Sequence, residues 1–128
     1  MKIGEIPSPA ADYTGRLVGL FNLDVAAYHR VLISNPSVTF ERVLSSPTDA
    51  AWIAPGACEN KIGYWHLPGV RLVFKRVGRI ESVAVASLIS WRGVWYVVHL
   101  GPNPRPLNVG TVDGFRSGPG TPGPAGGC

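Results

Sequence analysis

The chain has few cysteines, few charged residues and no long apolar run, and each shortage excludes a class of protein. Two cysteines, Cys58 and Cys128, are too few for a disulfide framework, although they leave room for one bridge. No stretch approaches the roughly 20 apolar residues of a membrane-spanning helix. With 45% hydrophobic and 16% charged residues, the chain is too apolar to be wholly disordered. Its 128 residues fit one folded domain.

Motifs for catalysis and metal binding are also missing. There is no nucleophile elbow of the G-x-S-x-G type and no phosphate-binding P-loop. The histidines His29, His66 and His99 have no metal-ligand spacing with one another or with Cys58. Residues 118–123 match G-x-G-x-x-G, but they lack the strand before and the helix after that a dinucleotide loop needs. We therefore expect neither a metal nor a cofactor.

Basic residues outnumber acidic ones by 12 to 8, which gives a net charge of +4. A positive charge attracts nucleic acid and anionic surfaces, but binding of this kind normally uses a dense basic patch. The densest basic group is spread along one stretch of the chain: Arg71, Lys75, Arg76 and Arg79. This spacing is typical of a solvated strand face and argues against nucleic acid as a partner.

Composition divides the chain into three parts. Residues 1–12 are rich in proline and alanine and are expected to form a flexible leader, followed by a single domain over 13–116. In residues 117–128, glycine and proline account for eight of twelve positions, which predicts a disordered tail. Deletion of such a tail is expected to leave the melting temperature unchanged.

The domain begins with a helical pattern. Apolar residues recur at steps of three or four, namely Leu17, Phe21, Val25, Tyr28 and Leu32. This period predicts an amphipathic helix that ends at the Asn-Pro pair 35–36. Gly15 and Gly19 each weaken a helix by about 1 kcal/mol relative to alanine. A second interpretation therefore stays open, in which Asp24 caps the start of the helix and residues 16–21 form a strand.

The rest of the domain has the pattern of strands. Strands are predicted over 38–44, 61–66, 70–76, 80–90 and 93–100, with one helical turn within 47–52. Val70, Leu72 and Phe74 alternate with other residues and are expected to face the core. The last strand is apolar on both faces, so we expect it to be central or covered on both sides. In this interpretation Trp95 is packed and Trp91 is more exposed.

Together these elements predict an α+β fold, with the N-terminal helix packed on a curved, mainly antiparallel sheet of four to five strands. Their order and the closing hairpin SLISWRGVWYVVH at 87–99 resemble the small NTF2-like and cystatin-like rolls, over about residues 13–100. The chain departs from the catalytic NTF2-like enzymes because its strands lack an obvious Asp/His pair. The resemblance therefore implies a fold without implying an active site.

Residues 58–74 and the closing hairpin also look like small uncharacterised exported or cell-envelope proteins of high-GC actinobacteria. That resemblance implies an extracytoplasmic or cell-envelope location. The first nine residues lack the apolar stretch of a secretory signal. Such a protein would therefore have lost its signal or anchor, and a cytoplasmic location is the alternative.

Two classes of function stay open. The missing motifs and the aromatic sheet favour a non-catalytic binding or cell-envelope-associated module, whose ligand the sequence does not identify. The expected contact residues are Tyr28, Tyr64, Trp65 and Tyr96. The partner would be a small molecule, an envelope component or a protein, and a homodimer through the sheet is a further option.

The alternative is a small pocket enzyme of the isomerase or dehydratase type. Asp24 and His99 would supply a carboxylate and an imidazole for proton transfer, with Tyr28 and His29 projecting into the same cleft. Non-catalytic roles explain two of these residues equally well, because Asp24 suits a helix cap and Tyr28 belongs to the apolar stripe.

Overall fold

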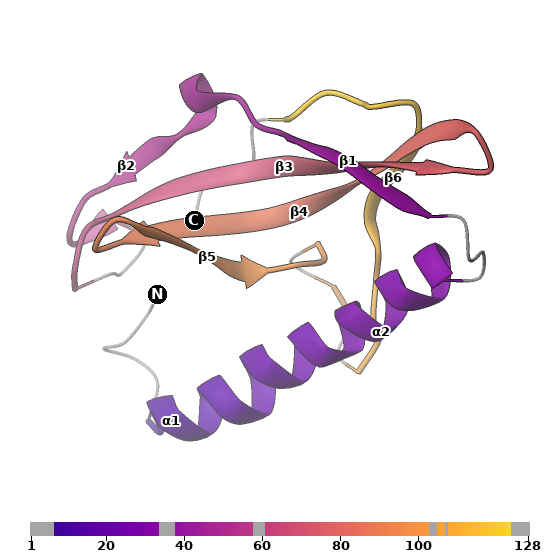
Figure 1. The fold of residues 1–128 in the computed structure, drawn as a ribbon. Helices are drawn as coiled ribbons and strands as arrows, with labels where there is room; N and C mark the ends of the chain where they lie inside the picture. The colour runs from indigo at the N-terminus through magenta and orange to yellow at the C-terminus, as the bar shows by residue number, and fades with distance from the viewer. Residues whose placement is uncertain (1–6, 34–37, 58–60, 103–104, 107, 124–128) are drawn as a thin grey trace.

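The computed structural model describes residues 7–33, 38–57, 61–102, 105–106 and 108–123. It shows an α+β domain in which one N-terminal helix lies along one face of an open antiparallel sheet (Figure 1). This confirms the predicted fold class, with six strands in place of four to five. Cys58 and Cys128 lie outside the described residues, and so does the question of a bridge between them.

The helix begins earlier than either interpretation of the sequence predicts. α1 (Pro9–Asp12) leads through a π-helical stretch (Tyr13–Val18) into α2 (Gly19–Ile33), and Figure 1 shows one continuous rod. The strand over 16–21 and the helix start at Asp24 are therefore wrong. Among the described residues, no helix is both long and apolar enough to cross a membrane.

Local chemistry explains the early start of the helix. Pro9 is the first helical residue, a position where the missing N–H of proline has no helical acceptor to lose. Asp12 and Arg16, one turn apart, form a surface ion pair at 2.7 Å. Gly15 lies within the π-helical stretch and Gly19 directly follows it, so the weak helix formers coincide with the irregular turn.

Two long strands form the centre of the sheet, and each carries two short strands on its outer edge. The strands are β1 (Thr39–Leu44), β2 (Ala51–Ile53), β3 (Tyr64–Arg76), β4 (Arg79–Trp91), β5 (Val94–His99) and β6 (Asp113–Ser117). β3 pairs with β4, β1 and β2 pair with β3, and β5 and β6 pair with β4, all antiparallel. The expected helical turn is a 3-10 turn at Pro47–Asp49.

β3 is one strand, although the sequence predicts two strands separated by Pro68-Gly69. The pairing with β4 runs through this point without a shift, with Pro68 opposite Ser87 and Val70 opposite Val85. Gly69 has a φ of +61°, a conformation that glycine adopts without strain. The Pro-Gly pair is therefore accommodated within the long strand and does not end it.

The core lies between the helix and one face of β3 and β4, which we call the helix face. Tyr28, Phe74 and Val83 are buried together there, with Leu72 packed against them. The prediction that Leu72 and Phe74 face the core is confirmed. Four further apolar residues complete the cluster: Leu32, Val38, Leu100 and Val112.

The opposite face of the sheet, which we call the back face, is less exposed than the sequence predicts. Arg71 is 4% exposed, so the predicted solvated face is wrong for this residue, and Val73 on the same face is 0% exposed. Lys75 and Arg79 are exposed as expected. Arg71 donates hydrogen bonds to Ser82 Oγ, at 2.8 Å from its nearer guanidinium nitrogen, and to the carbonyl of Gly114, so its buried N–H groups have acceptors.

The C-terminal segment covers this part of the back face. Beyond β6, residues 118–123 cross the sheet, and we call them the C-terminal strap. Ser82 Oγ donates to the carbonyl of Gly118 at 2.9 Å, and the N–H of Gly123 donates to the carbonyl of Gly69 at 3.4 Å. These contacts differ from the unpacked tail that the composition predicts. Because the strap is mainly glycine and proline, its backbone comes close to β3.

β5 is an edge strand, and the expectation that it is central or covered on both sides is wrong. It pairs with β4 alone among the described strands. Trp95 and Trp91 are both 44% exposed, so the predicted difference between them is wrong as well. An apolar pattern on both faces is compatible with a buried strand and with an unprotected edge, and here the second case applies.

Candidate functional site

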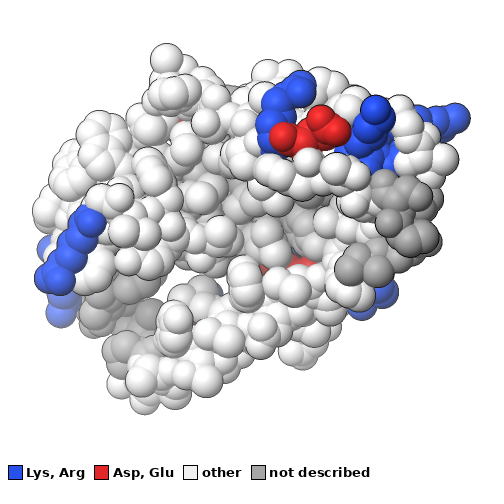
Figure 2. Space-filling view, viewed as in Figure 1, with Lys and Arg blue, Asp and Glu red and all other residues white. Residues whose placement is uncertain are grey.

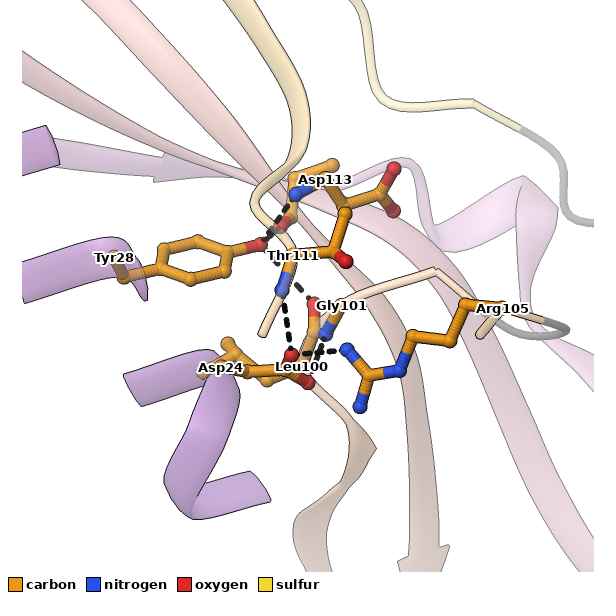
Figure 3. A network of polar contacts seen from close by, with 8 residues as sticks. Asp24, Tyr28, Leu100, Gly101, Arg105, Thr111 and Asp113 are labelled. Atoms are coloured by element: carbon orange, nitrogen blue, oxygen red, sulfur yellow. Dashed lines mark hydrogen bonds and ion pairs between the residues drawn. The ribbon is translucent and has the colours of Figure 1, made fainter. Parts of the chain in front are cut away.

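The carboxylate of Asp24 lies at the centre of a buried polar network between the helix and the segment that follows β5 (Figure 3). Asp24 is 1% exposed. It accepts hydrogen bonds from the N–H groups of Gly101 (3.0 Å) and Thr111 (3.1 Å). Arg105, whose side chain is 6% exposed, completes the set with an ion pair. Three donors from a distant part of the chain therefore converge on one helical carboxylate.

Tyr28, one turn further along the helix, extends this network. Its hydroxyl oxygen lies 2.5 Å from the carbonyl oxygen of Ala84 and 3.1 Å from that of Leu100, so either can accept its hydrogen. The same oxygen accepts from the N–H of Asp113 at 3.0 Å. Burial raises the pKa of Tyr28 to about 12, so the hydroxyl stays protonated and can donate.

Two glycines allow the close approach that this network requires. A Cβ atom at Gly110 would overlap the carbonyl group of Leu23 on the helix. A Cβ atom at Gly101 would crowd the backbone of Thr111 and the side chain of Asp24. Gly101 and Gly110 therefore pack close to the helix through contacts that need glycine at both points.

The Asp24–Tyr28 network joins the helix to residues that follow β5. Asp24 lies within α2, so the predicted helix cap is wrong. Among the described residues its hydrogen bonds go to Gly101, Thr111 and Arg105, and none goes to His99. A general base needs a lone pair directed at a substrate, and this carboxylate is occupied by three donors. The geometry favours anchoring over proton transfer.

Next to this network the helix and the sheet enclose a cleft. No residue of the π-helical stretch Tyr13–Val18 is buried. Figure 1 shows this half of the helix further from the sheet than the other half, and Figure 2 shows a mostly uncharged hollow between the two. On the sheet, His66 lies opposite Ile89, and Ile89 lies opposite Tyr96, so all three share the helix face. Ile89 and Tyr96 thus give the sheet side of the cleft an apolar surface.

Two histidines lie beside Ser87 on the helix face. His66 Nε2 is 2.8 Å from Ser87 Oγ, and His99 is the residue opposite Ser87 on β5. Burial lowers the pKa of His66. Burial also lowers the pKa of His99, and the positive charge of Arg16 on the helix acts in the same direction. Both imidazoles are therefore neutral near pH 7, when each ring has one donor and one acceptor nitrogen.

These histidines predict a dependence of stability on pH. Because their pKa values are lower in the folded chain than the ordinary 6.5, the unfolded chain binds more protons below about pH 7. The free energy of unfolding should be highest above this range and fall as the pH is lowered through 6.5. Urea unfolding at about pH 7.5 and about pH 5.5 measures the difference.

The control for this prediction is His29, which is exposed. A His66→Gln/His99→Gln double variant should lose most of the pH dependence, and His29→Gln should keep it. Burial raises the pKa of Asp113 from 3.8, which acts in the opposite direction but at more acidic pH. If the free energy of unfolding changed equally with pH in the wild type and the double variant, the two histidines would not be the cause.

The structure separates the four contact residues predicted from the sequence. Tyr28 is buried in the network, and Tyr64 and Tyr96 lie on the helix face. Trp65 lies on the back face, where its ring and that of Trp52 are 5.7 Å apart at 62°. His29 is exposed on the helix, which places it outside the network.

Sequence reasoning missed Arg105, Thr111 and the pair His66–Ser87. Arg105 and Thr111 meet Asp24 across more than 80 positions of the chain, so no local spacing marks them. His66 and Ser87 come from neighbouring strands, and their contact follows only from the register of β3 and β4. Within the described ranges, no group of three or more His, Cys, Asp or Glu residues is placed to hold a metal ion.

Comparisons with protein-family models, with curated proteins and with solved structures found no match. The function must therefore be argued from the residues of this chain.

Proposed function

We propose that this protein is a non-catalytic binding module that holds a small, largely apolar molecule in the cleft between the helix and the sheet. The observation that carries the proposal is the separation of the two layers beside the Asp24–Tyr28 network. On one side of that network the helix and sheet form the core, and on the other side the residues of Tyr13–Val18 stay unburied. Binding sites in proteins are commonly concave, mostly apolar and supplied with a few polar groups.

The polar groups of the cleft suit a ligand with one hydrogen-bonding end. His66 and His99 have lowered pKa values and are uncharged near neutral pH, and Ser87 lies between them. A neutral imidazole can donate to or accept from a hydroxyl, carbonyl or amide group. Ile89 and Tyr96 supply the apolar wall of the cleft.

The contacts of Asp24 support binding over the enzyme alternative. An isomerase or dehydratase would need a titratable group held in the cleft and free to exchange a proton. Asp24 accepts from three donors in a buried network. His99 would then lack the carboxylate partner that the enzyme hypothesis gives it.

We also propose a fold family and a location for the protein. A helix laid along one face of an antiparallel sheet supports an NTF2-like or cystatin-like roll. An extracytoplasmic or cell-envelope location is supported by the resemblance of residues 58–74 and 87–99 to exported actinobacterial proteins.

Filling the cleft tests the proposal. The amphipathic dye 1-anilinonaphthalene-8-sulfonate, whose aromatic rings would enter the cleft, should bind the folded protein saturably. Ile89→Trp should raise its dissociation constant by about tenfold or more, since the larger ring occupies the site. Leu88→Trp is the matched control, because the neighbouring residue points to the back face. Fluorescence titration gives both constants. Equal dye binding by the two variants would place the site elsewhere and overturn the proposal.

A further inference from the structure

We propose that β5 pairs with β5 of a second copy of this chain, so that two sheets join edge to edge in a symmetric dimer. The starting observation is the composition of the free edge. Four consecutive residues of β5 are large, apolar and exposed: Val94 (51%), Trp95 (44%), Tyr96 (45%) and Val97 (43%). Among the described strands only β4 pairs with β5, so the other edge of β5 is open to a partner.

The other outer strands carry features that protect an edge from pairing, and β5 does not. β1 contains Glu41 and Arg42 and has an irregular register at this point. β6 contains Asp113 and Arg116 and also has a register shift. Charges and bulges of this kind prevent edge-to-edge association. β2 is only three residues long. From Val94 to Val97, β5 has no charge, no proline and an unbroken register with β4.

The second copy is the occupant that this edge suits best. The chain has a net charge of +4, yet the exposed part of β5 is uncharged, so two copies bring no like charges into contact along this strand. A symmetric antiparallel pair makes the same surface serve both partners. A charged or strongly polar partner strand would instead leave its side chains against Trp95 or Tyr96.

The symmetry also limits the register. A two-fold axis between antiparallel strands stands perpendicular to the sheet, so paired residues must lie on the same face. With Tyr96 at the axis, each Tyr96 faces its own copy, Trp95 faces Val97, and Val94 faces Val98. Every pair then consists of aromatic or β-branched residues, which are the pairs that stabilise antiparallel sheets.

Trp95→Lys tests the dimer without altering the cleft, because Trp95 lies on the back face opposite Ser90, which in turn lies opposite Trp65. Sedimentation velocity should show a concentration-dependent dimer for the wild type and loss of that dimer for Trp95→Lys. Val43→Lys is the control, since Val43 is 51% exposed on the charged edge strand β1 and the change in charge is the same. Circular dichroism checks that both variants keep the sheet.

A second experiment tests the register. Tyr96→Cys, in a chain whose Cys58 and Cys128 are replaced by serine, should form an intermolecular disulfide under mild oxidation, because the symmetric pair brings two Cβ atoms to bonding distance. Val43→Cys in the same background should stay monomeric on a non-reducing gel. A wild type that sediments as a monomer at all concentrations would overturn the proposal. Equal dissociation of the Trp95→Lys and Val43→Lys variants would also overturn it.

Discussion

Replacing Asp24 by alanine should lower the free energy of unfolding by about 3–5 kcal/mol, the range found when one partner of a buried ion pair is removed. The change leaves Arg105 with its charge buried and without the carboxylate that pairs with it. It also removes the acceptor of the N–H groups of Gly101 and Thr111. Urea unfolding followed by tryptophan fluorescence measures the loss.

The exposed ion pair between Asp12 and Arg16 is the matched control. Asp12→Ala removes a carboxylate from the same helix but leaves no buried charge, so the urea midpoint should not change. A double-mutant cycle is completed by Arg105→Ala and by the Asp24→Ala/Arg105→Ala double variant. The losses of unfolding free energy in the two single variants should not add in the double variant, because both changes break the same ion pair. If Asp24→Ala proved as mild as Asp12→Ala, the contacts of Asp24 with Gly101, Arg105 and Thr111 would not stabilise the fold.

The same residue separates the two functional hypotheses. Asp24→Asn keeps the shape of the side chain and removes its charge. In the binding module this variant should lose stability but bind the dye in proportion to the fraction that stays folded. Loss of a measured turnover by a fully folded Asp24→Asn protein would instead support the enzyme alternative.

Local pattern was sufficient to predict the main elements of the fold. The apolar period from Leu17 to Leu32 predicts the helix, although Phe21 (39%) and Val25 (43%) are exposed. The alternation at Leu72 and Phe74 predicts the face of the sheet that packs on the helix. It was insufficient for β5, because the apolar residues of a covered strand and of an unprotected edge have the same pattern in sequence. The last strand, β6, pairs with β4 and not with β5, so no described strand pairs with the outer edge of β5.

The candidate site was predictable only in part. The sequence draws attention to Asp24 and Tyr28 as polar groups on the inner side of the helix, and the structure places both at one network. Their partners come from Ala84 and from residues 100–113, and such contacts depend on the path of the chain after β5. No periodicity describes that irregular segment, so its contacts follow from tertiary structure alone.

The C-terminal strap leads to the second large expected effect. A chain that ends at Ser117 should lose about 2–3 kcal/mol of unfolding free energy, because each hydrogen bond of the strap contributes about 1 kcal/mol. The lost bonds run from Gly118 N–H to the carbonyl of Ile80, from Ser82 Oγ to the carbonyl of Gly118, and from Gly123 N–H to the carbonyl of Gly69. For a domain of this size the melting temperature should fall by roughly 10 °C.

A chain that ends at Gly123 is the control for this truncation, because it keeps every contact that the structure shows for the strap. It should melt with the full chain in differential scanning calorimetry. Ser82→Ala adds an independent check: its cost should be smaller in the chain ending at Ser117 than in the full chain, since there the hydroxyl has already lost its acceptor at Gly118. Identical melting of all three chain lengths would mean that residues 118–123 contribute nothing to stability, and the composition-based expectation of a dispensable tail would then hold.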